Sequence, residues 1–491
     1  MRRLVSCALI LSLALAFFIS DTNHPSASAQ AAISARVLVW EATPNDDGQL
    51  EVLTSDGNIE VVVDFPAGQF ANVAKWCGHD YWTSNGQAVA VYTGAAQGDI
   101  TIYPVAGGTP IALGKANRMA CSGPMSFQFS PNGQRAGFID YLPESIDQEF
   151  PYGNLIIVDA TTGASLATFD WTTAFALYDN AALMLRFYPD GEGNATEADL
   201  VWWDGSAQQI LATLEPVFPV DQPDVECGLK SGAVARVGDN VFVLVGQRCE
   251  TGAASWRLLQ VPMGGGAATE IASGQPAGGF FTESFTTQLI PTKDNSGFLI
   301  TIPSGLGRNT VTLAWVTPEG AMTSLLEGQH VIADRFGERL SEGRHLLLSP
   351  DGNSLAFVTS TGDNIQTLWM LDMSTVGGVP LSIQEEGVNE RIFQYVWASN
   401  NRLYYAAGAI ESNSLNVVAP GEAPQRLARG RFYRLAVNFA GDKIAATEWV
   451  ANPERVGDDL SRLVVLDTAG KSATIKDGDQ SHNEFTPLAI Q

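Results

Sequence analysis

The sequence is poor in several residue types that carry chemistry in proteins. Of its 491 residues only 5 are histidine and 5 are cysteine, and 28 basic residues stand against 53 acidic ones, for a formal net charge of −25. Polyanions repel so acidic a chain, which argues against nucleic acid and anionic membranes as partners. We find no G-x-S-x-G elbow of a serine hydrolase.

Long apolar runs are confined to the beginning of the chain. Residues 1–29 combine the basic start MRR, the apolar stretch LVSCALILSLALAFFIS and the small residues Ala27-Ser28-Ala29, which is the pattern of a cleaved signal peptide. The alternative is a membrane anchor, but residues 4–19 are shorter than the ~20 apolar residues that a span requires. We therefore predict a signal peptide at residues 1–29 and an exported domain at residues 30–491, periplasmic or extracellular, with no membrane span in the mature chain.

The rest of the chain consists of short apolar runs separated by turn residues. In LLLSPDGNSLAFVTS (346–360), Pro350 and Asp351 suit the central positions of a turn, and Gly352 suits the left-handed position that closes it. The strand that follows is apolar on both faces, so it requires a neighbour on each side. FSPNGQRAGFID (129–140) repeats the pattern, and such recurrence indicates a repeat protein.

The pattern of turn and strands recurs along most of the chain, with a turn about every 41 to 59 residues. We find no sustained helical periodicity after the first 29 residues. Eight units with four candidate strands each span residues 81–113, 127–169, 175–211, 234–271, 289–326, 346–383, 396–428 and 435–475.

These units predict an all-β fold, a single β-propeller of about eight four-stranded blades, within a range of seven to nine. Residues 37–65 make the number of blades uncertain to count, because they contain three candidate strands without an inner strand. The tail EFTPLAIQ (484–491) could supply that inner strand and create a ninth unit. Two smaller propellers are a minor alternative.

The repeat resembles that of the TolB-type, WD-like β-propeller family. In that family a blade reads aromatic-Ser-Pro-Asp-Gly and an apolar strand, followed by an apolar strand that ends in Asp. FSPNGQRAGFID with NLIIVD, and LSPDGNSLAFV with LWMLD, match closely. WTSNGQAVAVY, WASNNRLYYA and NFAGDKIAA are degenerate versions, whereas the units starting at 175, 234 and 289 match only in period and hydrophobic pattern.

Four cysteines remain after the signal peptide, and an even number in an exported chain suggests disulfides. Cys227 and Cys249 lie almost symmetrically about the turn at Gly238 and Asp239, so they face each other across one hairpin. Cys77 and Cys121 each precede the inner strand of consecutive units. We predict the pairs Cys77–Cys121 and Cys227–Cys249; four free thiols are the alternative.

Metal and ligand sites are weakly indicated. The histidines after the signal peptide, His79, His330, His345 and His482, are scattered and are expected to be surface or core residues. The loops 190–199 and 477–484 alternate oxygen-bearing side chains, as calcium loops do, but neither completes a calcium-binding pattern, and polar inter-strand loops are the favoured interpretation. Tryptophans within the repeats are expected to serve packing between blades rather than to line a carbohydrate-binding face; they include Trp82, Trp202, Trp203, Trp315, Trp369 and Trp397.

We therefore predict no catalytic, cofactor-binding or metal-binding residue, and no cofactor, with calcium as the open alternative. We expect an exported, non-enzymatic, monomeric propeller that binds a protein, a peptide or an envelope component through the loops at one end of the ring. The resemblance favours this role, since it implies an interaction platform in the bacterial envelope. The alternative is a propeller enzyme, such as a lactonase, a lyase or a glycan-cleaving protein, with carboxylates and a cation at the central channel.

Overall fold

The computed structural model describes most of the chain after residue 32. The described residues are 33–42, 48–65, 87–93, 97–117, 127–145, 152–189, 195–217, 226–251, 254–275, 289–303, 311–326, 331–332, 346–360, 365–387, 390–452, 459–478 and 484–491.

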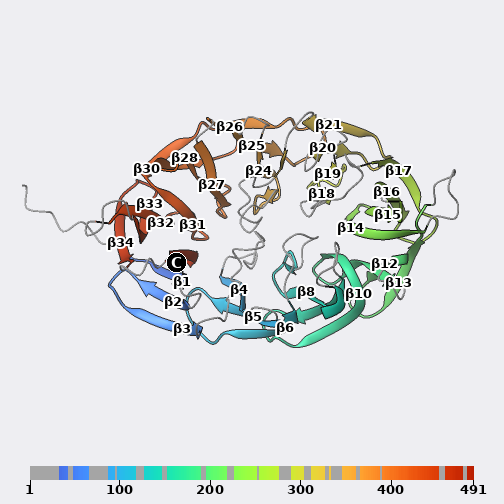
Figure 1. Cartoon of the computed structure of the whole chain (residues 1–491), viewed down its shortest axis with the longest axis horizontal. Helices are drawn as coiled ribbons and strands as arrows, with labels where there is room; N and C mark the ends of the chain where they lie inside the picture. Colours follow the sequence, from blue (N-terminus) through green and yellow to red (C-terminus); the bar gives the residue numbers. More distant parts are fainter. Residues whose placement is uncertain are drawn as a thin grey trace, which may run out of the picture.

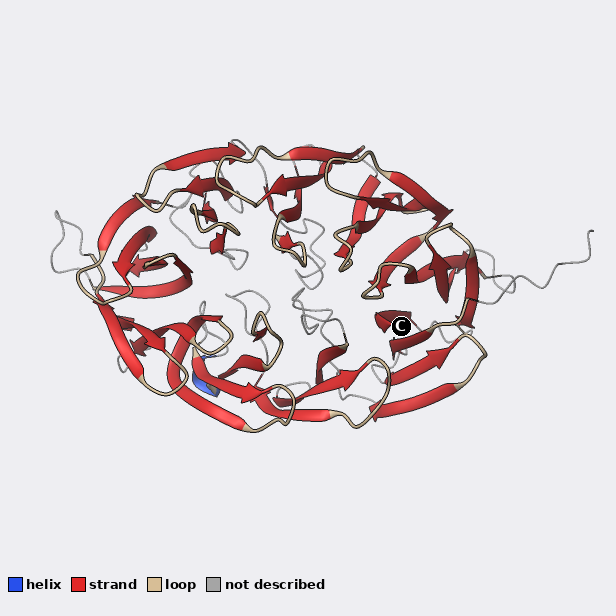
Figure 2. Cartoon of the chain, turned by 180° about the vertical axis from the view of Figure 1, so that it is seen from behind, coloured by secondary structure: helices blue, strands red, loops and turns tan. Residues whose placement is uncertain are grey.

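The described strands form one elongated ring of radially arranged antiparallel sheets, each with one edge strand toward the middle (Figure 1). Seen from behind, the ring is built almost entirely of strands (Figure 2). The one helical element among the described residues is a short 3-10 turn at Pro143–Ser145. The fold is a β-propeller, as the repeated turns and two-sided apolar strands predict.

Blade 1 joins the two ends of the described chain. Its strands are β1 (Arg36–Ala42), β2 (Gly48–Thr54), β3 (Ile59–Phe65) and, innermost, β35 (Glu484–Ile490). β35 pairs antiparallel with β1, and backbone bonds between Arg36 and Gln491 continue the ladder. The C-terminal strand therefore completes a sheet whose other strands come from the N-terminal part of the domain (Figure 1).

Blades 2 to 4 follow, and blades 3 and 4 share a strand. Blade 2 has three described strands, and its predicted inner strand lies outside the described residues. β10 pairs with β9 through its first half and with β11 through its second half, so it is the outermost strand of blade 3 and the innermost of blade 4. The strands are β4 (Ala88–Thr93), β5 (Gln97–Pro104), β6 (Ile111–Asn117), β7 (Phe127–Phe129), β8 (Arg135–Tyr141), β9 (Gly153–Asp159), β10 (Ser165–Leu177), β11 (Ala182–Pro189), β12 (Ala195–Trp203) and β13 (Gln208–Leu214).

Blades 5 to 9 complete the ring. In blade 7 two short segments, β22 and β23, both pair with β24 at the innermost position. The strands of blade 5 are β14 (Cys227–Val237), β15 (Asn240–Cys249), β16 (Ala254–Pro262) and β17 (Thr269–Gly274). Those of blade 6 are β18 (Leu289–Pro291), β19 (Phe298–Pro303), β20 (Val311–Val316) and β21 (Met322–Leu326).

The last three blades have the same order from the inside outward. Blade 7 has β22 (Val331–Ile332), β23 (Leu347–Leu348), β24 (Ser354–Ser360), β25 (Gln366–Asp372) and β26 (Leu381–Glu386). Blade 8 has β27 (Glu390–Trp397), β28 (Leu403–Ala409), β29 (Ser412–Val418) and β30 (Gln425–Gly430). Blade 9 has β31 (Phe432–Val437), β32 (Lys443–Ala451), β33 (Asp459–Asp467) and β34 (Ser472–Asp477).

The hydrophobic core lies between blades rather than within one. Leu355 and Phe357 of β24 belong to a cluster shared with blade 6, whereas Ala356 between them belongs to a cluster shared with blade 8. Each of the other clusters likewise combines residues of neighbouring blades. Alternate residues of a strand point to opposite faces, which is why the strands must be apolar on both.

The described strands thus group into nine blades, the upper end of the predicted range. The ninth arises as the sequence suggested, because the tail at residues 484–491 supplies the inner strand for residues 37–65. The signal peptide at residues 1–29 and the domain boundary at residue 30 stay predictions, since residues 1–32 lie outside the described part of the chain.

Candidate functional site

The turn between the first two strands has one construction in several blades. In blade 7 the Ser349 hydroxyl accepts a bond from the backbone N–H of Ser354 at 2.9 Å and donates to Asp351 Oδ1 at 2.6 Å. Gly352 has φ of 71° and its N–H donates to the carbonyl oxygen of Ser349. Ser130 of blade 3 makes the equivalent bonds, with Arg135 N–H and with Asn132. The predicted turn is therefore confirmed in both blades with the closest sequence match.

Blade 6 has the same turn, which the sequence motif does not reveal. Thr292 takes the place of the serine, accepts from Gly297 N–H at 3.2 Å and contacts Asp294 Oδ1 at 3.0 Å. Asn295 takes the place of the glycine, with φ of 57°. Asparagine is the residue after glycine that best tolerates this conformation, so Asn in place of the turn glycine was the available signal.

These turns also bind the next blade. The N–H of Asn132 donates to Asp179 Oδ1 at 2.8 Å, and Asn401 Nδ2 donates to Asp351 Oδ2 at 2.8 Å. Because the sheets are antiparallel, turns after the first and third strands of every blade lie at the same end of the ring. We call this end the turn face.

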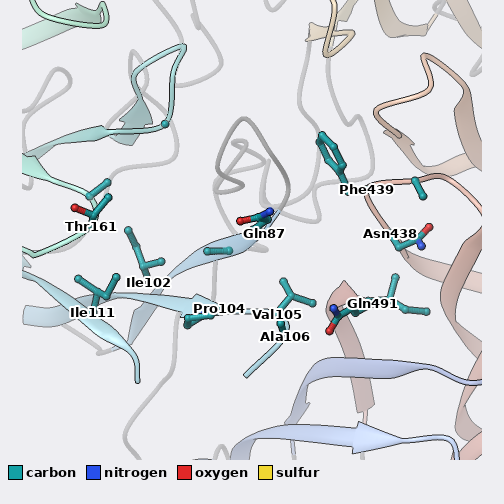
Figure 3. A pocket seen from close by; sticks show the side chains of 15 residues that line it. Gln87, Ile102, Pro104, Val105, Ala106, Ile111, Thr161, Asn438, Phe439 and Gln491 are labelled. Atoms are coloured by element: carbon teal, nitrogen blue, oxygen red, sulfur yellow. The ribbon is translucent and has the colours of Figure 1, made fainter. Parts of the chain in front are cut away.

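A pocket of about 800 Å³ opens on the turn face where the ring closes. Its walls come from blades 1, 2, 3 and 9, and its lining is mainly apolar. In Figure 3, Phe439 and Asn438 lie on one side, Ile102, Ile111 and Thr161 on the other, and Val105 and Gln491 between them. Among the described residues that line it, none has an ionisable side chain.

The wall that carries Phe439 is held in place by its backbone. The carbonyl oxygen of Phe439 accepts bonds from the backbone N–H and the hydroxyl of Ser399, and that of Ala440 accepts from Asn400 Nδ2 at 3.1 Å. The Phe439 side chain is nevertheless 46% exposed. The anchored turn therefore presents a half-exposed phenyl group beside an apolar pocket.

Carboxylates surround the turns, and hydrogen bonds keep several of them ionised. Bonds from Thr161 lower the pKa of Asp159 below its usual value. Bonds from Thr54 and from Ser296 do the same for Asp56 and Asp294, respectively. These three turn carboxylates therefore stay ionised in mildly acidic solution.

A buried ionic cluster connects blade 9 to blade 1 next to the closing strand. Lys476 Nζ of β34 contacts Glu41 Oε2 and lies 3.0 Å from Glu51 Oε2. Both carboxylates are buried, and burial raises the pKa of Glu51. Burial lowers the pKa of Lys476, but the bonds to the two glutamates outweigh it and raise that pKa overall.

Another buried carboxyl lies between blades 7 and 8, at the opposite end of the sheets from the turns. Glu386 is 4% exposed, accepts from Gln384 Nε2 at 2.9 Å, and has Glu390 as a neighbour. Burial, followed by the contact with Glu390, raises the pKa of Glu386 to about 7. Tyr405 Oη lies 3.3 Å from Gln384 Oε1. No sequence pattern indicates that this glutamate is buried.

Glutamines on inner strands join neighbouring blades and were also missed. Gln128 donates to the carbonyl oxygen of Phe175 and accepts from the N–H of Leu177, and Gln394 makes the same pair of bonds with Leu435. Each amide thus bonds to the backbone as a neighbouring strand would. The short repeats F-Q-F and F-Q-Y at these positions were the available signal.

The predicted cysteine pair Cys227–Cys249 is a disulfide that closes the first hairpin of blade 5, where the two residues are directly opposite. Cys77 and Cys121 lie outside the described residues, as do His79, His330, His345 and His482. The second pairing therefore stays a prediction.

The two acidic loops are only partly described. Asp199 accepts bonds from Tyr188 and Thr213, and Asp477 accepts from Arg462 Nε at 2.6 Å. These carboxylates thus have protein donors. Residues 190–194 and 479–483 lie outside the described part. Across the described ranges, no three His, Cys, Asp or Glu side chains gather as metal ligands.

Most of the tryptophans singled out in the sequence pack between strands, as predicted. Trp315, Trp203 and Trp397 are buried, and the indole N–H of Trp315 and that of Trp397 donate to the carbonyl oxygens of Gly378 and Leu347. Trp369 donates to Thr359 Oγ1, and the ring of Trp202 is near Tyr178. Trp82 lies outside the described residues.

In the part of the chain described, no helix is long and apolar enough to span a membrane.

No protein-family model matches the sequence, and no curated protein matches it. Among solved structures, the chain is similar to a eukaryotic initiation factor, with 12% identity and a TM-score of 0.47 over 91% of this chain and 97% of that one. It is also similar to a prolyl endopeptidase, with 11% identity and a TM-score of 0.43 over 78% and 53% of the two chains. A third similar structure is an oligogalacturonate lyase in complex with manganese, with 10% identity and a TM-score of 0.40 over 84% and 94%. Function does not follow from similarity at this level.

Proposed function

We propose that this chain is an exported, non-enzymatic β-propeller of the TolB type that binds a protein, a peptide or an envelope component on its turn face. The observation that carries the proposal is the pocket at the ring closure, with Phe439 exposed on an anchored turn. The described side chains that line it include apolar groups for contact, and none of them has an ionisable group for acid–base chemistry. The Ser-Pro-Asp/Asn-Gly turns support the TolB-type assignment, and the Cys227–Cys249 disulfide is compatible with export. The proposal includes a monomer without a nucleic-acid partner.

Affinity capture tests this function. The protein, expressed from the full sequence and purified without reducing agent, is immobilised and exposed to envelope and culture-medium extracts of the source cells. We expect one or a few proteins or polymers to be enriched over an unrelated acidic propeller. The variant Phe439→Ser should reduce that enrichment. Val379→Ser is the matched control, because Val379 is 79% exposed on blade 7 and does not line the pocket. Absence of any enrichment would overturn the proposal.

The alternative is a propeller enzyme, and Glu386 is the observation that favours it. A carboxyl with a pKa of about 7 can serve as a general acid or base near neutral pH. If capture fails, polysaccharides and lactones should be assayed as substrates with and without added divalent cation. Loss of any turnover in Glu386→Gln, with turnover retained in Phe439→Ser, would support the enzyme.

A further inference from the structure

A lysine and two glutamates meet at the edge of the apolar core between blades 9 and 1. Glu41 lies two residues after Val39 on β1, and Glu51 of β2 is directly opposite Val39, so the two carboxyl groups share the face that packs against blade 9. Both glutamates are buried, and Lys476 of β34 reaches them from blade 9. Its Nζ is also 5.5 Å from the ring centre of Phe485, which is fully buried. The two carboxyl groups therefore lie among apolar side chains rather than in open solvent.

The arrangement brings an amine into contact with one carboxyl group and within hydrogen-bond distance of another. Lys476 Nζ contacts Glu41 Oε2, and Glu51 Oε2 is 3.0 Å from the same nitrogen. The amine can thus attack one carboxyl while the other carries protons. By contrast, Lys115 and Asp99 form an ion pair of 3.6 Å in which both side chains are largely exposed. The Lys476 cluster combines contact with burial, which a surface ion pair does not.

We propose that the Lys476 amine and the Glu41 carboxyl condense to an isopeptide bond in the folded protein, with Glu51 as the proton carrier. The inference goes beyond the proposed binding function and does not depend on it. The Nζ lone pair forms the new bond to Cδ of Glu41, and one C–O bond of that carboxyl breaks. Of the three ammonium protons, one stays on the amide nitrogen, and Glu51 passes the other two to the oxygen that leaves as water. No oxidant, reductant or cofactor is required, because an ammonium and a carboxylate yield an amide and water.

The protonation states of the three groups decide how much the reaction depends on proximity. Burial lowers the pKa of Lys476, but its bonds to the glutamates raise that pKa overall, so the amine is protonated before reaction. It must first pass a proton to Glu51, and burial raises the pKa of Glu51, which favours that transfer. Groups held in contact react as if present at about 10⁵–10⁸ M, which compensates for a small share of neutral amine.

Bond formation replaces two charges beside the apolar core with a neutral group. A buried ion pair has a desolvation cost that its mutual attraction offsets only in part, whereas an amide has no net charge. The bond joins β34 of blade 9 to β1 of blade 1, next to the pairing of β35 with β1. It therefore adds a covalent link to the closure of the ring.

Intact mass spectrometry of the purified and denatured protein tests the bond. The comparison is with Lys476→Arg, which keeps the positive charge but has a guanidinium that stays protonated and cannot attack. We expect the two masses to differ by the substitution and by one water in addition. Lys471→Arg, at an exposed position, is the control and should differ from the unaltered protein by the substitution alone. The inference is overturned if Lys476→Arg also differs by the substitution alone.

Peptide mapping locates the bond. Trypsin should not cleave after a linked Lys476, so the fragment 472–491 should be found joined to the fragment 37–75, which contains both glutamates. Fragment ions should place the amide on Glu41. Separate fragments, with cleavage after Lys476, would contradict the inference, and an amide on Glu51 would reverse the roles of the two glutamates and contradict it as stated.

Glu51→Gln tests the proton carrier, because the amide has a similar shape but does not accept a proton. We expect this variant to be purified in the unlinked form and to lose water at least about 10²-fold more slowly than the unaltered protein. Its circular dichroism spectrum, compared with that of Lys476→Arg, shows whether the ring has formed. Equal linkage in Glu51→Gln and the unaltered protein would overturn the assigned role of Glu51.

Discussion

Two junctions of the ring differ in how they hold neighbouring blades together. Between blades 3 and 4 the chain itself makes the connection, since β10 belongs to both sheets. At the closure the chain passes from β34 of blade 9 into β35, and the seam is the non-covalent pairing of β35 with β1 inside blade 1, beside the Lys476 cluster. A continuous strand keeps the two sheets joined by covalent bonds, whereas the seam depends on backbone pairing and on side-chain contacts. A buried charge cluster and the apolar pocket both lie at this closure.

The largest expected effect is at the seam. Lys476→Met leaves Glu41 and Glu51 buried without a positive partner, which should destabilise the fold by about 3–5 kcal/mol. Urea denaturation followed by tryptophan fluorescence measures the change. Lys471→Met, at an exposed position in the preceding turn, is the control and should change stability by less than about 0.5 kcal/mol. Equal effects of the two variants would show that the seam does not depend on this cluster.

The second prediction concerns the disulfide of blade 5, which lies away from the seam. The double variant Cys227→Ser/Cys249→Ser removes a crosslink between residues 22 apart and should cost about 2–4 kcal/mol, chiefly because the unfolded chain gains freedom. Denaturation without reducing agent measures it. Pocket binding should be retained, because the described residues that line the pocket come from blades 1, 2, 3 and 9. An unchanged denaturation midpoint would contradict this prediction.

The third prediction uses pH at the junction of blades 7 and 8. Glu386 has a pKa of about 7 in the folded protein against an ordinary value of 4.5, so the folded state holds its proton more tightly than the unfolded state. The resulting stabilisation is present below pH 4.5 and is lost as pH rises through about 7, by up to about 3 kcal/mol.

Glu386→Gln provides the comparison, because the amide does not titrate. The difference in stability between the variant and the unaltered protein should change across that pH range, with the variant relatively more stable at the higher pH. Denaturation midpoints of both proteins in parallel at several pH values measure it. A difference that is constant with pH would show that Glu386 titrates as an ordinary glutamate.

The smallest effect is expected at a single turn. Ser349→Ala removes the hydroxyl that accepts from Ser354 N–H, which should cost about 1–2 kcal/mol. Thermal unfolding compares it with Ser374→Ala, which leaves the backbone bond of Ser374 to Asp372 in place. Equal melting temperatures of the two variants would show that the turn hydroxyl does not stabilise blade 7.

Much of the fold could be predicted because blade structure is encoded locally. The turn of Ser349 to Gly352 has a residue pattern dictated by its backbone, and β24 alternates between two apolar faces. The sequence motif does not identify the turn of blade 6, because Thr292 provides the hydroxyl and Asn295 adopts the positive φ that serine and glycine provide elsewhere. The pocket could not be predicted, since Ile102 and Phe439 are brought together only when the ring closes.

The sequence by itself determined the all-β repeat, the turn chemistry and the pairing of Cys227 with Cys249, because each depends on residues close together along the chain or on a local hairpin register. Only the tertiary structure decided the nine-bladed closure through β35, the Lys476 cluster and the pocket. These features depend on which distant segments of the chain come into contact. A strand that is apolar on both faces can pack against any blade of this kind, so its sequence does not specify its neighbour.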